Sequence, residues 1–200
     1  MSTPVAIIDG GGANIASLQF ALQRLGAESV LTCDHETIRA AERVILPGVG
    51  AARAAMEKLA ATGLDDLIPT LLQPVLGICL GMQLFFQGSE EDDADCLGII
   101  EGYARRFEDA PDRPVPHMGW NQVEKTRNAR VLDGIPDGAH FYFVHSYAID
   151  TVATTSGVTD YGGAFTSVVH KVNFLGTQFH PERSGRYGSR LLKNFLMLSD

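Results

Sequence analysis

The chain has 200 residues, of which 45% are hydrophobic and 20% are charged. This length suits one domain around one buried core, and the composition is too apolar for a disordered chain. Sixteen basic against 24 acidic side chains give a formal net charge of −8, so the field at neutral pH repels nucleic acid and anionic lipid. No apolar run approaches the ~18 residues that span a bilayer. We therefore expect a single domain over residues 1–200 with no membrane or nucleic-acid partner.

The cysteines indicate the compartment and argue against bound groups. Cys33, Cys79 and Cys96 are odd in number and widely spaced, which favours neither a disulfide framework nor a zinc site. Asp9 interrupts the one apolar start, so no secretory signal is predicted and we expect a cytoplasmic protein. The glycine run at 10–12 lacks GxGxxG spacing. We predict no cofactor and no metal.

Short apolar runs that end at Gly or Pro alternate with helical patterns in the first ~90 residues. Runs that are apolar on both faces predict interior strands of a sheet covered on both sides. Strands are predicted at 5–8, 44–46 and 75–79, and helices at 14–25, 51–61 and 64–72. The alternation predicts an α/β fold: a doubly wound, mostly parallel sheet with helices on both faces.

The second half has a different texture. Five carboxylates in residues 90–95 lack the spacing of divalent-metal ligands, so a solvated loop is expected there. Aromatic and β-branched runs at 115–123, 140–149, 165–170 and 174–179 predict strands, with an added antiparallel section. Ser184 is the expected N-cap of a closing helix whose buried face includes Leu191 and Phe195.

The sequence Gly77-Ile78-Cys79-Leu80-Gly81 falls where a strand ends and a helix begins. It has the spacing of a nucleophile elbow with Cys in place of Ser. The turn is so tight that glycine on both flanks removes a side-chain clash. The start of a helix favours a nucleophilic sulfur, and the next backbone N–H can stabilise an oxyanion. The alternative is a buried strand cysteine beside turn glycines.

A cysteine nucleophile needs a base and a group that orients the base. His180 and Glu182 follow the run at 174–179, and Pro181 stiffens the segment so that residues two apart can project the same way. Alone, His-Pro-Glu reads as a surface turn; with the elbow it predicts a Cys-His-Glu triad. His145, in an aromatic strand, is expected to be structural. The loop Pro47-Gly48-Val49-Gly50 is either a second oxyanion donor or an ordinary connection that needs two glycines.

These three segments, in this order, resemble the signature segments of class I glutamine amidotransferases. Met82 before Gln83, the run Pro116-His117-Met118-Gly119-Trp120-Asn121 and the run Phe143-Val144-His145-Ser146-Tyr147 are similar to the glutaminase subunits of imidazole glycerol phosphate synthases.

The resemblance implies that Cys79 attacks the side-chain amide of L-glutamine, His180 moves the proton and Glu182 orients His180. It further implies glutamine contacts and an oxyanion hole. The implied glutamine-binding residues are Gly50, Gln83, Ser146 and Tyr147, and the implied oxyanion-hole residues are Leu80, Val49 and Gly50.

Hydrolysis of glutamine would give glutamate and ammonia. The implied partner is a (β/α)8-barrel cyclase, which would receive this ammonia to make imidazole glycerol phosphate and an aminoimidazole carboxamide ribonucleotide. Asn14, Met118, Trp120 and Arg183 are the implied interface residues. Two departures bear on this: the run 10–12 is all glycine where the family commonly has Tyr-Gly, and Arg183 stands where Lys is usual. The alternatives are another synthase partner with the same chemistry and a non-catalytic module on the same fold.

Overall fold

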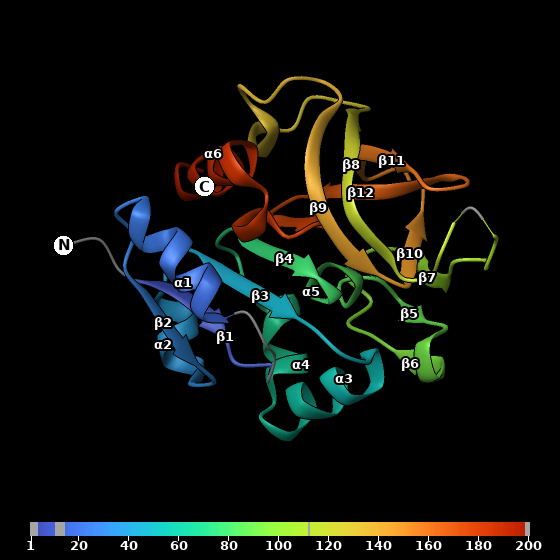
Figure 1. Ribbon diagram of the computed structural model, residues 1–200. Coiled ribbons are helices and arrows are strands. Elements are labelled where there is room, and N and C mark those ends of the chain that lie inside the picture. Colours follow the sequence, from blue (N-terminus) through green and yellow to red (C-terminus); the bar gives the residue numbers. More distant parts are fainter. Residues whose placement is uncertain (1–3, 11–14, 112, 199–200) are drawn as a thin grey trace.

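The structure, a computed structural model, describes residues 4–10, 15–111 and 113–198. Figure 1 shows a sheet flanked by helices in the blue and green N-terminal part, continued by long yellow and orange strands. The helices are α1 (Ile15–Arg24), α2 (His35–Ala40), α3 (Ala52–Ala61), α4 (Leu64–Leu67), α5 (Leu80–Gln83) and α6 (Gly185–Leu196), with the 3-10 turns η1 (Ile68–Thr70), η2 (Glu91–Asp93), η3 (Arg130–Leu132) and η4 (Pro181–Arg183). The strands are β1 (Val5–Ile8), β2 (Ser29–Thr32), β3 (Val44–Gly48), β4 (Val75–Cys79), β5 (Gly88–Ser89), β6 (Ala94–Asp95), β7 (Tyr103–Arg106), β8 (His117–Lys125), β9 (Ala139–His145), β10 (Tyr147–Asp150), β11 (Thr155–Asp160), β12 (Ala164–Lys171) and β13 (Phe174–Thr177).

The predicted fold class is confirmed. Strands β2, β1, β3, β4 and β13 lie side by side in this order and are all parallel. β1 and β4 are buried along their whole length, because helices cover both faces of the sheet. Buried residues of α1 and α6 pack with Ile7, Ile45 and Leu76 on one face, and those of α2, α3 and α4 pack with Ile8 and Leu46 on the other.

Several predicted boundaries were wrong for local reasons. The helix expected over 64–72 ends at Leu67 and continues as η1, which contains Pro69, a residue without a backbone N–H. The strand β2 was missed because it is only partly buried and lacks an apolar run, and α2 was missed because it has six residues. The run at 140–149 is two strands, β9 and β10, which separate at Ser146.

The second half adds the predicted antiparallel section. β12 pairs antiparallel with β13, β10 and β11, and β8 pairs antiparallel with β11 and β9. β13, however, pairs parallel with β4. The strand therefore joins the two halves of the sheet, and its carboxyl end lies beside that of β4.

Ser184 occupies the N-cap position of α6, but its side chain does not cap the helix. The hydroxyl donates to the carbonyl oxygen of His180 at 2.7 Å and accepts from the backbone N–H of Tyr142 at 3.0 Å. The backbone N–H of His180 in turn donates to the carbonyl oxygen of Tyr142 at 2.9 Å. The hydroxyl of Ser184, predicted to cap the helix, instead joins β9 to the segment that follows β13 by hydrogen bonds.

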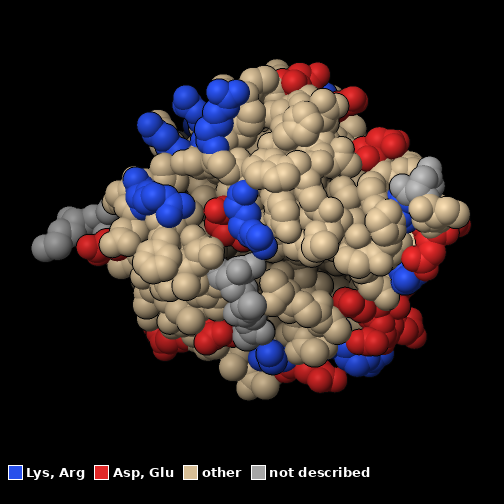
Figure 2. Space-filling view, in the orientation of Figure 1, with Lys and Arg blue, Asp and Glu red and all other residues tan. Residues whose placement is uncertain are grey.

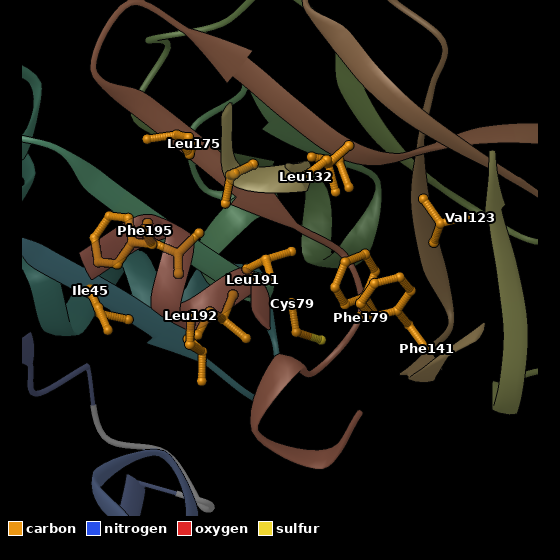
Figure 3. Packing of buried hydrophobic residues seen from close by; sticks show 14 of the residues in the cluster. Ile45, Cys79, Val123, Leu132, Phe141, Leu175, Phe179, Leu191, Leu192 and Phe195 are labelled. Carbon is orange, nitrogen blue, oxygen red and sulfur yellow. The ribbon is translucent and has the colours of Figure 1, made fainter. Parts of the chain in front are cut away.

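A stacked pair of aromatic rings also holds the segment that follows β13. The rings of Phe141 and Phe179 are both fully buried and lie 4.0 Å apart between centroids, with an interplanar angle of 26°. Figure 3 shows the two rings next to each other, in the buried cluster that also contains Cys79. Because Phe179 precedes His180, the stack fixes the start of the segment on which His180 lies.

We expect Phe141→Ala to lower the free energy of unfolding by about 3–5 kcal/mol, because it removes a fully buried ring and leaves a cavity under Phe179. Urea denaturation measures the loss. Leu72→Ala is the control, since Leu72 is 87% exposed and its truncation should change the free energy by less than about 0.5 kcal/mol. Equal effects of the two substitutions would contradict this account of the core.

Candidate active site

Cys79 is the last residue of β4 and has φ 55° and ψ −113°. A residue with a Cβ atom rarely adopts this backbone conformation, which costs on the order of 1–3 kcal/mol. The chain turns sharply here and enters α5 at Leu80. The predicted strand–turn–helix context of the cysteine is therefore present.

The flanking glycines are needed for the turn, as predicted. A Cβ atom on Gly77 would lie 2.7 Å from the carbonyl oxygen of Gly81, and one on Gly81 would lie 1.9 Å from the carbonyl oxygen of Leu46. The expected contribution of a helix dipole is smaller than predicted, because α5 is a single turn of four residues. Steric necessity, more than the dipole, explains this part of the sequence.

The imidazole of His180 and the carboxylate of Glu182 form a buried pair. Glu182 Oε1 lies 2.9 Å from His180 Nδ1, and the two side chains are 3% and 4% exposed. Because a carboxylate accepts hydrogen bonds, Nδ1 is the donor. The other ring nitrogen, Nε2, has no well-aligned hydrogen-bond partner among the described residues. The arrangement leaves Nε2 available to a reacting group.

Cys79 is coupled to this pair. Burial lowers the pKa of His180, but the hydrogen bonds and charges of Cys79 and Glu182 outweigh burial and raise that pKa to about 10. Cys79 Sγ also lies 3.7 Å from the carbonyl oxygen of Val144, to which the thiol can donate.

A cavity of about 400 Å³ opens above Cys79. It brings together the predicted residues Cys79, His180, Leu80, Val49, Gly50, Gln83, Ser146 and Tyr147. Glu182 lies behind His180, away from this cavity. The cavity suits a small polar molecule placed against the sulfur.

Glu91 also lines the cavity, and sequence reasoning missed it. It lies in the segment 90–95 that was expected to be a solvated loop, which is wrong for this residue. Glu91 Oε2 accepts the backbone N–H of Ala52 at 3.0 Å, and burial raises the pKa of the Glu91 carboxyl. Asp92, Asp93 and Asp95 are exposed, as expected.

Gln178 is the second residue that sequence reasoning missed. It is fully buried, its Nε2 donates to Cys79 Sγ at 3.8 Å, and its Oε1 accepts from Gln83 Nε2 at 2.8 Å. Gln83 Nε2 also donates to the carbonyl oxygen of Tyr147 at 2.9 Å. The signal was the spacing in Gln178-Phe179-His180, because residues two apart in an extended segment face the same side.

The residues predicted at an interface lie apart from the cavity floor. Met118 and Trp120 are 67% and 57% exposed, so neither fills the core. The guanidinium of Arg183 lies 4.3 Å above the ring centroid of Tyr142, and that ring makes an edge contact with Trp120 at 6.1 Å. Asn14, with Gly11 and Gly12, lies outside the described residues.

The described residues also bear on metal binding and on membrane-spanning helices. They contain no cluster of three or more His, Cys, Asp or Glu side chains placed to hold a metal ion. The helices described here include none that is both long and apolar enough to cross a bilayer.

We expect Gly81→Ala to destabilise the protein by about 3 kcal/mol, because the new Cβ atom would overlap the carbonyl oxygen of Leu46 and force the elbow to shift. Gly98→Ala is the control, since Gly98 has φ 63° with no atom within 4 Å of its Cβ position, and it should cost about 1 kcal/mol of backbone strain. Thermal and urea unfolding compare the two, and equal losses would refute the steric account of the elbow.

Comparison with known proteins agrees with this geometry. Residues 6–198 match the glutamine amidotransferase class-I family. The chain is 50% identical over 197 residues to the imidazole glycerol phosphate synthase subunit HisH of Xanthomonas campestris, covering 98% of each chain. It is also 50% identical over 194 residues to the HisH subunit of Xylella fastidiosa, covering 97% of each.

Solved structures share the fold at lower identity. One is a glutamine amidotransferase with a TM-score of 0.74 and 20% identity, which covers 96% of both chains. Another, from Thermotoga maritima, has a TM-score of 0.64 and 17% identity over 98% of this chain and 83% of that chain. On the strength of the family match over nearly the whole length, this chain belongs to the class I glutamine amidotransferases.

Proposed function

We propose that the whole chain acts as one glutaminase domain, the ammonia-producing subunit of an imidazole glycerol phosphate synthase. The observation that carries the proposal is the joint position of Cys79, His180 and Leu80 on one cavity, with Glu182 bonded to the far side of the imidazole. The 50% identity to HisH subunits over almost the entire chain supports this member of the family.

The chemistry begins with the sulfur of Cys79, which attacks the side-chain amide carbon of glutamine while its proton passes to His180 Nε2. The tetrahedral oxyanion is stabilised by the backbone N–H of Leu80 and by the Val49–Gly50 peptide. Gly50 has φ 94°, and a glycine can reach other backbone conformations without a side-chain clash, which suits a peptide that turns.

Collapse of the tetrahedral intermediate expels the amide nitrogen, which takes the proton from His180 and leaves as ammonia. Having accepted the thiol proton in the first step, His180 is the imidazolium at this point, which is the state required of a general acid. Water then attacks the Cys79 thioester while His180 accepts the water proton; the carbon–sulfur bond breaks, glutamate is released, and His180 returns the proton to the sulfur. Glu182 orients the imidazole and stabilises its positive charge.

The cavity offers complementary groups for an amino-acid substrate. Of the described residues that line it, Glu91 alone carries a carboxyl group, which suits the α-ammonium of glutamine. Gln83, Ser146 and Tyr147 supply polar groups next to the sulfur and hold the remainder of the substrate. No cofactor is required for this reaction.

The partner proposed for the ammonia is a (β/α)8-barrel cyclase in the cytoplasm, which forms imidazole glycerol phosphate and an aminoimidazole carboxamide ribonucleotide. The exposed Met118 and Trp120 are suited to anchor it, because exposed aromatic side chains are typical centres of protein interfaces. Arg183 contributes a charge beside them. Figure 2 shows basic side chains gathered over the position of α6, which carries Arg186, Arg190 and Lys193 and no acidic residue.

We expect Cys79→Ala to abolish glutamine-dependent synthesis by the reconstituted complex, because no other group can form the thioester. Ammonia supplied directly should still support synthesis at the wild-type rate, since the barrel chemistry does not use the sulfur. Formation of glutamate and of imidazole glycerol phosphate measures the two activities.

Loss of both activities on substitution, or survival of both, would contradict the role of Cys79. A wild-type chain that binds the barrel without any glutamine-dependent rate would favour the non-catalytic module. The remaining alternative is another synthase partner with the same chemistry. Purification of the native complex tests it, because recovery of a different synthase would identify that partner.

We expect Glu91→Gln to raise KM for glutamine by about tenfold or more, because it removes a charge-assisted contact to the α-ammonium. The amide oxygen introduced at position 91 can still accept the backbone N–H of Ala52, so the start of α3 should keep this hydrogen bond. Asp92→Asn is the matched control, since Asp92 is exposed and does not line the cavity. Steady-state kinetics decide, and equal KM values for the two variants would exclude Glu91 from substrate binding.

A further inference from the structure

Two buried histidines, of which His145 lines the cavity and His117 lies beyond it, have no part in the proposed chemistry. His117 on β8 and His145 on β9 face each other across the antiparallel ladder and are 4% and 7% exposed. His117 Nδ1 lies 3.0 Å from His145 Nε2. Since one nitrogen of this contact must donate and the other accept, the contact constrains the protonation of both rings.

The surrounding atoms leave one consistent assignment. His145 Nδ1 lies 2.8 Å from the carbonyl oxygen of Tyr147, which can only accept, so Nδ1 carries the proton. In a neutral ring His145 Nε2 is then an acceptor, and His117 Nδ1 must donate to it. His117 Nε2 is therefore an acceptor as well.

Asn121 completes the chain of hydrogen bonds. Its Oδ1 accepts the backbone N–H of Gln122 at 2.8 Å, which fixes the orientation of the amide. Its Nδ2 consequently faces His117 Nε2 at 3.3 Å and also donates to the carbonyl oxygen of Asp160 at 2.9 Å. Both histidines are thus neutral Nδ1–H tautomers, and a chain of hydrogen bonds runs from Asn121 through His117 and His145 to the carbonyl oxygen of Tyr147.

Packing agrees with neutral rings. Tyr161 and Phe143 stack on His117 at 4.0 and 4.9 Å between centroids, and Phe107 and Phe165 lie 5.2 Å from His145. Burial lowers the pKa of His117 to about 4. The pKa of His145 is lowered to about 3, mainly by burial, and the nearby His117 and His180 contribute to this shift, because like charges repel.

The chain ends on an atom that matters for the substrate. The carbonyl oxygen of Tyr147 accepts from His145 Nδ1 at 2.8 Å and from Gln83 Nε2 at 2.9 Å. Tyr147 and Gln83 both line the cavity above Cys79. This carbonyl is therefore one of the two acceptors, with Gln178 Oε1, that hold the amide of Gln83 in place.

We propose that His117 and His145 are positioning residues for the glutamine site: as a neutral, directed pair they hold the Tyr147 carbonyl and, through it, the Gln83 amide. The inference rests on the proposed glutaminase function. A pair that only filled the core could be replaced by rings of similar shape without an effect on substrate binding, whereas a positioning pair requires the donor at the Nδ1 position.

The test compares His117→Phe with His117→Asn in the complex with the barrel. Phenylalanine keeps the ring stack but removes the donor, and asparagine places an amide N–H near the position of Nδ1. We expect His117→Phe to raise KM for glutamine about tenfold with kcat within about threefold of wild type, as for the loss of one buried hydrogen bond. His117→Asn should return KM to within about threefold, and ammonia-dependent synthesis should stay unchanged in both.

A folded His117→Phe complex with the wild-type KM, or an Asn variant no better than Phe, would overturn the proposal. A second measurement does not depend on folding of the variants or on activity. Imidazole ¹⁵N NMR of the wild-type chain at pH 7 should show a proton on Nδ1 and none on Nε2 for both residues. A proton on either Nε2 would refute the assignment, whereas absent glutaminase activity with the expected tautomers would refute only the proposed function.

Discussion

The parallel pairing of β13 with β4 is the constraint on which the site depends. The register places Gly176 beside Gly77 and Thr177 beside Ile78, so the two chains leave the sheet at the same edge. The proposed nucleophile, Cys79, is the last residue of β4, and the proposed base, His180, follows the end of β13 by three residues. β3 pairs with β4 on its other side, with Gly48 beside Cys79, and this brings the loop with Gly50 to the same edge.

Small residues make this convergence possible. A Cβ atom on Gly176 would lie 2.3 Å from Met82, and one on Gly48 would lie 2.7 Å from the backbone nitrogen of Gly81. The short helix α5 therefore lies almost in contact with the backbones of the strands on either side of β4. A larger residue in place of any of these glycines would displace α5 and with it the backbone N–H of Leu80, the proposed oxyanion donor.

The pKa values of two buried histidines that line the same cavity are shifted in opposite directions, and their neighbours explain the difference. His180 has a carboxylate and a thiol as neighbours, which favour the imidazolium and raise its pKa to about 10. His145 has a carbonyl oxygen and a neutral imidazole, which cannot offset its burial, and its pKa falls to about 3. The opposed pKa shifts agree with the proposed roles, in which His180 carries a proton and His145 is a fixed hydrogen-bond donor.

The sequence predicted the parts of the site that local chain geometry enforces. The turn at Cys79 cannot form without Gly77 and Gly81, so the spacing is visible in the sequence alone. Glu91 was not predicted, because its role depends on the packing of its segment against the start of α3, where Ala52 lies. The parallel pairing of β13 was also beyond sequence reasoning, since strand direction depends on contacts about a hundred residues apart.

Strand β8 faces two ways, with His117 and Asn121 directed inwards and Met118 and Trp120 directed outwards. Because side chains alternate along a strand, gaining or losing one residue in this stretch would exchange the two sets at once. The hydrogen-bonded chain would then point into solvent and the tryptophan into the core. Natural relatives can therefore be expected to vary in loop length on either side of this strand while keeping its internal length constant.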